Sequence, residues 1–350
     1  MQAPSSHRGR TVNRQRRALV AAVPLLASGL ASAGVFSPQR ARQPLLQESR
    51  PLMGTRVDIS ASGRDPGQLR AAIALAWAEM ERLVAMMSRF RPTSVVSAIN
   101  LAAGLQAIAV PPELMQVLKM ARRESERSGG AFDVTVASIT DWSFDPRHPR
   151  MPSPQALARQ LPLVDYRHLV LDERAGTAFL TRRGMRIDLG GVAKLPILDA
   201  GIQTLKGQGI TAAMINGGGD VVVGGPLEDR PWRVGVRDPR APQRLLGVLP
   251  VSEGFVVSSG DYERYFVDQG ERLHHVLDPS TGLPAHGLRG LTLVGRELGS
   301  VNGAGAALMV GGAGAARARL NAQRELEALW VQADGGLWVA PGLARRLSAA

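Results

Sequence analysis

The residues with the clearest chemical potential lie close together between Phe255 and Pro284, in the run FVVSSGDYERYFVDQGERLHHVLDPSTGLP. This run supplies hydroxyl, carboxylate, guanidinium and imidazole groups from Ser258, Ser259, Asp261, Tyr262, Arg264, His275, Asp278 and Thr281. Two short strand-like stretches flank Asp268-Gln269-Gly270, a combination that predicts a hairpin turn. A hairpin requires the turn but not this density of polar side chains, so the segment is a candidate active site.

Within this segment, His275 is the candidate for proton transfer, because an imidazole titrates near the working pH of most enzymes. Its neighbour His274 would point to the opposite face of a strand, so only one of the two easily faces a site. The alternative for His275 is an ordinary strand histidine bonded to Asp278 or to a backbone carbonyl.

A second chemical signal is the glycine run Asn216-Gly217-Gly218-Gly219-Asp220, which follows an expected strand. A dinucleotide-binding G-x-G-x-x-G is excluded because Val222 occupies the position of its third glycine, and the sequence contains no Walker motif. Three glycines remove every side chain from the approach to the backbone. They predict either a tight strand–strand turn or a turn at which a ligand comes close.

The elements expected to position these residues alternate between helices and strands, without internal repeats. Helical spacing covers 68–88, the double proline at 111–112 begins a helix that ends at the glycines 129–130, and a third helix is expected over 192–205. Strands are expected at 52–60, 169–171, 177–181 and 210–215, followed by a region mostly of strands and a Gly/Ala-rich helix near 301–310. This mixture predicts an α+β fold with mixed or antiparallel sheets and packed helices, in one domain over 51–340.

Composition excludes several functions. The chain has 350 residues, 45% of them hydrophobic, and no cysteine, which rules out thiol catalysis, Cys-ligated zinc, iron–sulfur clusters and disulfides. The net charge is +12, but five arginines among the first twenty residues account for part of it. The remaining excess is scattered, without the basic stripe or interleaved aromatic residues of a nucleic-acid surface.

The N-terminus resembles an export signal. Arg16-Arg17 precede an uncharged run over 18–33 that ends in Ala31-Ser32-Ala33, in the order of a signal peptide and its cleavage site. The paired arginines suggest the twin-arginine route, and the run is short for a membrane span. We expect a signal peptide over 1–33, a linker over 34–50 and a periplasmic protein; the alternative is an uncleaved signal that anchors the chain in the inner membrane.

Six blocks, in order along the chain, resemble those of the ApbE family of FAD:protein FMN transferases. They are Met53-Gly54-Thr55, Met87-Ser88-Arg89-Phe90 with Asn100, Ser128 to Thr135, Ile187 to Lys194, Asn216 to Asp220, and the segment from Phe255 to Pro284. The resemblance covers roughly residues 50–312. It implies an ApbE-like fold and transfer of FMN from FAD to a Ser or Thr hydroxyl of an acceptor flavoprotein, with release of AMP. The acceptor is expected to be a membrane-associated electron-transfer component.

The resemblance also implies roles for individual residues. Phe90 would stack on the isoalloxazine, and Lys194 would place a positive charge at the pyrophosphate. Asp133 and Asp188 would accept hydrogen bonds from the ribityl, ribose or adenine groups. Asp261, the second catalytic candidate, would orient His275 or hold the adenine. The further positions expected to bind FAD are Met53, Ala131, Phe132, Gly218, Gly219, Ser259, Gly260, His275 and Val276.

One block departs from the family pattern. The family binds Mg²⁺ through an Asp, a Thr and a backbone carbonyl, and the corresponding residues here are Asn302, Ala306 and Gly191. Because Mg²⁺ prefers anionic oxygen ligands, we expect metal binding to be weak or lost, FAD binding to be kept and transfer to be slow or absent. Leu195-Pro196 is a second departure. Two alternatives to a working transferase therefore stay open: a degenerate FAD-binding pseudoenzyme or flavin carrier, and an FAD pyrophosphatase.

Overall fold

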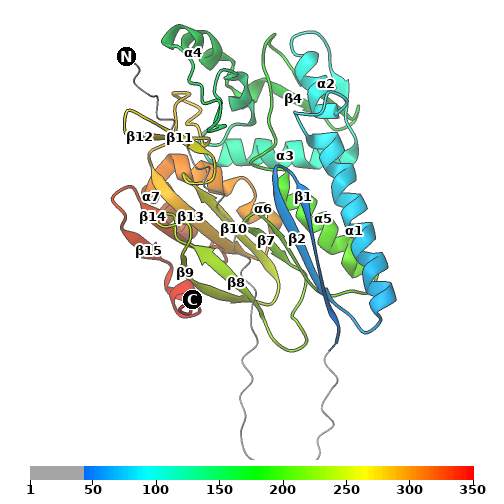
Figure 1. Cartoon of the computed structure of the whole chain (residues 1–350). Helices are drawn as coiled ribbons and strands as arrows, with labels where there is room; N and C mark the ends of the chain where they lie inside the picture. The colour runs from blue at the N-terminus through cyan, green and yellow to red at the C-terminus, as the bar shows by residue number, and fades with distance from the viewer. Residues whose placement is uncertain (1–42) are drawn as a thin grey trace, which may run out of the picture. The chain divides into compact units, whose positions relative to one another are not determined.

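The computed structural model describes residues 43–350, which form one compact unit (Figure 1). The expected signal peptide lies outside the described residues, as does most of the expected linker. The last residues of that linker differ from expectation, because β1 (Leu45–Leu52) pairs along its whole length with β2 (Thr55–Ser62). Within residues 43–350 no helix combines the length and the apolar character needed to cross a membrane.

The centre of the domain is an eight-stranded sheet in which every neighbouring pair is antiparallel. Its spatial order is β1, β2, β6 (Ala212–Gly217), β7 (Asp220–Val223), β10 (Gly254–Gly260), β13 (Leu288–Gly295), β14 (Glu327–Gln332) and β15 (Leu337–Val339). An antiparallel sheet confirms the α+β prediction and excludes the doubly wound alternative.

Three smaller sheets complete the strand set. They are β3 (Ile108–Ala109) with β5 (Thr177–Leu180) and β4 (Leu169–Asp172), then β8 (Trp232–Arg237) with β9 (Leu245–Val251), then β11 (Tyr265–Asp268) with β12 (Glu271–His274). The last pair is the predicted hairpin. Gln269 and Gly270 at its tip both have positive φ, 46° and 85°, as the two-residue hairpin turn requires.

The helices lie close to where the sequence places them. They are α1 (Pro66–Met87), α2 (Val95–Leu101), α3 (Pro112–Arg127), α4 (Pro154–Gln160), α5 (Lys194–Gly207), α6 (Leu298–Val301), α7 (Ala304–Ala322) and α8 (Pro341–Ala344). The α1 helix begins at a capping aspartate, Asp65, whose carboxylate accepts from Gly67 N at 2.7 Å. The structure differs from expectation in α2, α4 and α8, which the sequence did not predict because each is too short for its periodicity to show, and in α7, which extends well past residue 310.

Alternation along the strands gives the sheet two apolar faces. On β10, Phe255 and Val257 belong to the main core, whereas Val256 belongs to a second, smaller core. Helices α1, α5 and α7 lie on the main-core face (Figure 1). The β8–β9 pair and α8 contribute the second core on the opposite face.

One end of the central sheet collects the candidate residues. The register pairs Val57 with Gly217, and Gly260 with Gly290. The start of β2, the glycine turn between β6 and β7, and the end of β10 therefore lie at the same end. Helix α3 and the β11–β12 hairpin lie at this end too (Figure 1). In an antiparallel sheet the start of one strand lies beside the end of the next. The β1–β2 turn and the glycine turn are therefore neighbours, although more than a hundred residues separate them in the sequence.

Candidate active site

The glycine turn packs against the β1–β2 turn. Gly218 and Gly219 have φ of 72° and 106°, a region that glycine adopts at low cost. A Cβ on Gly218 would come within 2.3 Å of Thr55 Oγ1, so the backbone of the turn lies directly on Thr55. Asn216 Oδ1 accepts a hydrogen bond from Gly219 N at 2.9 Å. The turn is thus a tight strand–strand connection whose glycines also allow close packing.

Lys194 links two of the sequence blocks. It is the first residue of α5, and its Nζ lies 2.7 Å from Asp220 Oδ2. Asp220 Oδ1 in turn accepts from Ser258 N at 3.2 Å. The loop before α5, the glycine turn and the end of β10 are therefore joined by one carboxylate. The charge of Lys194 is balanced by Asp220 in this structure, and its role at the pyrophosphate stays a prediction.

The two adjacent histidines have different surroundings. His274 is buried, and its Nε2 lies 2.7 Å from the carbonyl oxygen of Ala285. The ring of His275 instead reaches solvent. The protein around it nevertheless lowers its pKa to about 4, chiefly by burial and next through the Arg264 guanidinium. His275 is therefore exposed to a ligand, with the charges of Arg264 and Lys194 nearby.

The carboxylates proposed to support His275 are occupied elsewhere. Asp261 Oδ1 accepts from Arg272 Nη1 at 2.9 Å, and its Oδ2 lies 3.7 Å from Arg289 Nε. Asp278 Oδ1 accepts from the backbone and hydroxyl of Ser280. Among the described contacts neither carboxylate bonds to the imidazole, so the predicted orienting role of Asp261 is not seen in this structure. Its alternative role toward adenine stays a prediction.

Asp133 shapes the loop after α3. Its side chain is buried; Oδ1 accepts from Thr135 N and Oγ1 at 2.8 and 2.6 Å, and Oδ2 accepts from Tyr166 N at 2.8 Å. Burial raises the pKa of this carboxyl above its ordinary value. Both oxygens are satisfied within the chain, so Asp133 caps a short 3₁₀ turn, while its contact with FAD stays a prediction. Phe132 beside it packs against Gly191.

Phe90 and Asp188 meet through Arg89. The Arg89 Nε lies 2.8 Å from Asp188 Oδ2, and its guanidinium stacks over the Phe90 ring at 4.5 Å. Asn100 fixes the strand-like segment before Asp188, because its amide exchanges two hydrogen bonds with the backbone of Ile187, at 2.7 and 3.1 Å. The Phe90 side chain is 74% exposed. The ring is exposed apart from its contact with Arg89, and its stacking on a flavin stays a prediction.

The other residues expected at the FAD site occupy the same end of the sheet. Met53 has φ of 53° in the β1–β2 turn, and the Tyr262 ring covers Gly260. A Cβ on Gly305 would lie 2.3 Å from Ser259 Oγ, so Ser259 touches the first turn of α7. Val276 is half-buried against the main core, and Ala131 lies in the turn after α3.

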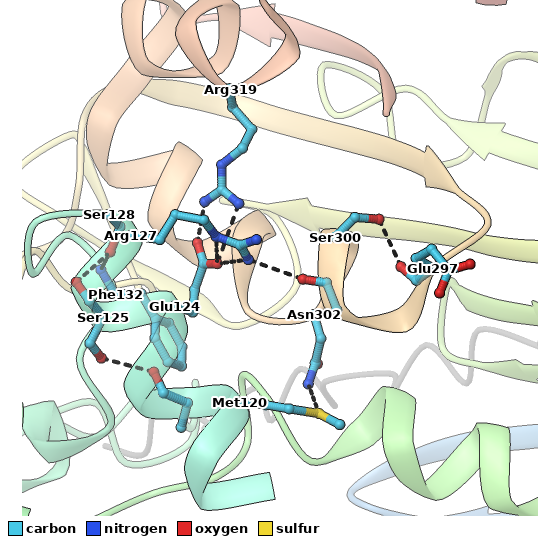
Figure 2. Close-up of polar contacts among 12 residues, drawn as sticks. Met120, Glu124, Ser125, Arg127, Ser128, Phe132, Glu297, Ser300, Asn302 and Arg319 are labelled. Carbon is cyan, nitrogen blue, oxygen red and sulfur yellow. Dashed lines mark hydrogen bonds and ion pairs between the residues drawn. The ribbon is translucent and has the colours of Figure 1, made fainter. Parts of the chain in front are cut away.

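The residues at the expected metal position do not fit Mg²⁺. Asn302 is buried, and its amide points toward Met120, with Nδ2 3.5 Å from Sδ (Figure 2). Ala306 offers no donor and packs against the core. No cluster of three or more His, Cys, Asp or Glu suited to a metal occurs in residues 43–350. One neutral amide and the Gly191 carbonyl are a poor donor set for a cation that prefers carboxylates.

An ionic cluster of Glu124, Arg127 and Arg319 lies next to this position. It was not predicted from the sequence. The Glu124 carboxylate is fully buried between the guanidiniums of Arg319 and Arg127 (Figure 2). Arg127 Nη2 also donates to Gly299 O at 3.1 Å. Gly303, next to Asn302, packs on Glu124: a Cβ there would lie 3.1 Å from Glu124 Cγ. No sequence signal marked Glu124, because the run ARRESER resembles an ordinary solvated helix face.

The comparisons with known proteins agree with one another. A family model described as "ApbE family" matches residues 53–330. An FAD:protein FMN transferase of Treponema pallidum (strain Nichols) is 31% identical over 266 residues, covering 71% of this chain and 73% of that protein. One from Rhodobacter capsulatus is 29% identical over 343 residues, covering 97% of this chain and 65% of that protein.

Solved structures show the same similarity. The crystal structure of the ApbE protein from Thermotoga maritima superposes with a TM-score of 0.80 at 28% identity, covering 87% of this chain and 99% of that one. The flavin transferase ApbE from Vibrio cholerae superposes with a TM-score of 0.74 at 25% identity, covering 87% of this chain and all of that one.

Proposed function

This chain belongs to the ApbE family and is an FAD:protein FMN transferase; we propose that it works through the residues gathered at one end of the central sheet. The main observation in support of this location for the active site is the position of His275. His275 is exposed, and it lies close enough to Lys194 and Arg264 for their charges to lower its pKa. The two open alternatives, a flavin carrier and a pyrophosphatase, are not favoured by the comparisons.

We propose that FAD lies with its flavin toward Phe90 and its pyrophosphate toward the glycine turn and Lys194. The exposed Phe90 ring offers a stacking face. Lys194 and the backbone at Gly218 and Gly219 offer charge and close approach. Phosphoryl transfer asks the protein chiefly for positioning and for neutralisation of charge on the phosphate oxygens, which this end of the sheet can supply.

The reaction forms a bond between the acceptor hydroxyl oxygen and the phosphorus of the FMN half of FAD. The bond between that phosphorus and the oxygen bridging to AMP breaks, and AMP leaves with the electron pair. His275 takes the hydroxyl proton. Its pKa of about 4 leaves it neutral at pH 7 and able to accept. A bound pyrophosphate would offset the nearby cations and raise its basicity.

Three finer points are proposals. Magnesium binds weakly, because Asn302 and Ala306 lack the carboxylate and hydroxyl that Mg²⁺ prefers. The acceptor is a membrane-associated electron-transfer flavoprotein bearing a Ser or Thr site. The chain is exported to the periplasm, as suggested by the arginine pair and apolar run of residues 16–33.

The test is an incubation of the purified chain with FAD and an acceptor protein that carries a Thr site. We expect AMP release together with covalent flavin fluorescence on the acceptor, and loss of that fluorescence when the acceptor Thr is replaced by Val. Release of AMP with free FMN, at the same rate with and without acceptor, would instead indicate hydrolysis. Bound FAD without AMP release would indicate a binding protein, and either result would overturn the proposal.

A further inference from the structure

Arg264 lies at the candidate site, and the proposed mechanism has not used it. It occupies the turn between β10 and β11, and its side chain is exposed. Its carbonyl oxygen accepts from His275 N at 3.1 Å, so its backbone is tied to the candidate base. Its guanidinium extends in the other direction, over the β1–β2 turn: a Cβ on Gly54 would lie 3.0 Å from Arg264 Nη2.

Arg264 therefore joins two parts of the site. Gly54 follows Met53, and the next residue, Thr55, is in contact with the glycine turn at Gly218. The guanidinium thus lies one residue away from the turn at which the pyrophosphate is proposed to bind. On its other side it is close enough to act electrostatically on the His275 ring, as Lys194 also does.

The neighbouring cations are already neutralised. Lys194 is paired with Asp220 at 2.7 Å, and Arg89 with Asp188 at 2.8 Å. Arg272 and Arg289 share the carboxylate of Asp261. Arg264 has no carboxylate partner among residues 43–350. It differs in this respect from Lys194, Arg89, Arg272 and Arg289, each of which has a carboxylate partner.

From this arrangement we infer that Arg264 is the phosphate-binding cation of the site, and that its guanidinium supplies the pyrophosphate of FAD with charge that the altered metal position cannot. This inference rests on the proposed function. A planar guanidinium binds phosphate oxygens through two parallel N–H donors, and its exposure leaves those donors free for a ligand. Position 302 lacks the carboxylate that would hold Mg²⁺, and Lys194 is shared with Asp220, so the Arg264 guanidinium adds the charge that offsets a dianionic group.

The experiment measures binding of FAD and of riboflavin, which lacks phosphate, by flavin fluorescence in EDTA. The variants are Arg264→Ala, Arg264→Lys and a control, Arg70→Ala, which removes an exposed arginine on α1 away from the site. We expect Arg264→Ala to weaken FAD binding at least about tenfold, the loss of one or two charged hydrogen bonds. Riboflavin binding should stay within about twofold, Arg264→Lys should recover part of the affinity, and Arg70→Ala should change neither.

A second measurement does not depend on FAD. The His275 imidazole is followed by NMR titration in the free chain, and we expect its pKa to rise in Arg264→Ala but not in Arg70→Ala, because removing a nearby positive charge favours the protonated ring. Unchanged FAD affinity in Arg264→Ala, or an equal loss for riboflavin, would overturn the inference. Failure of the unmodified chain to release AMP would count against the proposed function and not against Arg264.

Discussion

Two charged regions of this molecule, one at the end of the central sheet and one at the junction of α6 and α7, use charge differently. At the end of the sheet, His275, Lys194 and Arg264 reach solvent in full or in part. At the junction of α6 and α7, Glu124 and Arg319 are buried and satisfy each other. In the first region a positive charge stays available to a ligand. In the second region the opposite charges pair with each other and stabilise the fold. Substituting a charged residue in the first region should therefore lower activity or ligand binding, whereas substituting one in the second region should lower stability.

The comparison also locates the departure from the family. The blocks at the open end of the sheet keep the family pattern except at Leu195-Pro196, and the altered residues Asn302 and Ala306 lie at the junction of α6 and α7. There, Gly303 packs on both Glu124 and Phe132, and Phe132 packs on Gly191. The junction and the Gly191 loop are therefore connected through an aromatic ring.

The largest effect is expected from Glu124→Ala. Its removal leaves the Arg319 guanidinium buried without its carboxylate, which costs about 3–5 kcal/mol of unfolding free energy. Urea denaturation measures it. The control Glu126→Ala, which breaks the exposed Arg122 pair on the same helix, should cost less than about 1 kcal/mol.

A double variant sharpens the same comparison. Glu124→Leu with Arg319→Leu replaces the buried pair by apolar groups and should recover most of the stability lost in Glu124→Ala. If Glu124→Ala unfolded no more easily than Glu126→Ala, the buried cluster would not hold the junction as described.

The two histidines provide the next contrast. His275→Ala should lower the transfer rate by about 10²–10⁴-fold, the usual contribution of a general base, and should leave the urea midpoint nearly unchanged. His274→Ala should instead lower stability, because it removes the buried bond to the Ala285 carbonyl. Rates with saturating FAD and acceptor, together with urea curves, separate the two. Equal loss of activity in both variants, with equal stability, would contradict the division of roles.

Restoring the family residues should move the junction toward metal binding. In Asn302→Asp with Ala306→Thr, a buried carboxylate close to Glu124 should destabilise the chain in EDTA. Mg²⁺ at 100 times its Kd should then add about 2.7 kcal/mol. Thermal unfolding with and without Mg²⁺ measures this difference, and the unmodified chain should not respond. A comparable shift in the unmodified chain would show that Asn302 and Ala306 bind the metal after all.

The smallest effect expected is on pH dependence. A base must be neutral to accept a proton, so activity is lost as pH falls through its pKa. Because the pKa of His275 is lowered to about 4, kcat/KM should stay nearly constant from pH 8 down to pH values well below 6.5, the ordinary histidine value. Circular dichroism at each pH checks that the chain stays folded. A half-loss near pH 6.5 would mean that His275 is not the group that limits the rate.

Much of the fold could be predicted because it depends on local signals. Helical spacing and the double proline located α1 and α3, and Gln269-Gly270 located the hairpin turn, since each requires only a short window of sequence. The prediction failed where signals are short or long-range. Helix α2 spans two turns, and the strand β1 lies in a stretch of linker-like composition that is ordered by pairing with β2.

The sequence by itself determined the family and the α+β class, because six ordered blocks carry that information. It also put Asn302 and Ala306 where the resemblance expects a carboxylate and a hydroxyl. Only the tertiary structure decided how charges are paired. It separated Lys194, bonded to Asp220, from Arg264, which lies over Gly54 and has no carboxylate partner in the part of the chain that the structure describes, and it buried Glu124 between two arginines. The reason is physical: whether a charge serves a ligand or the fold depends on which opposite charges lie within a few ångströms, and chain folding alone sets those distances.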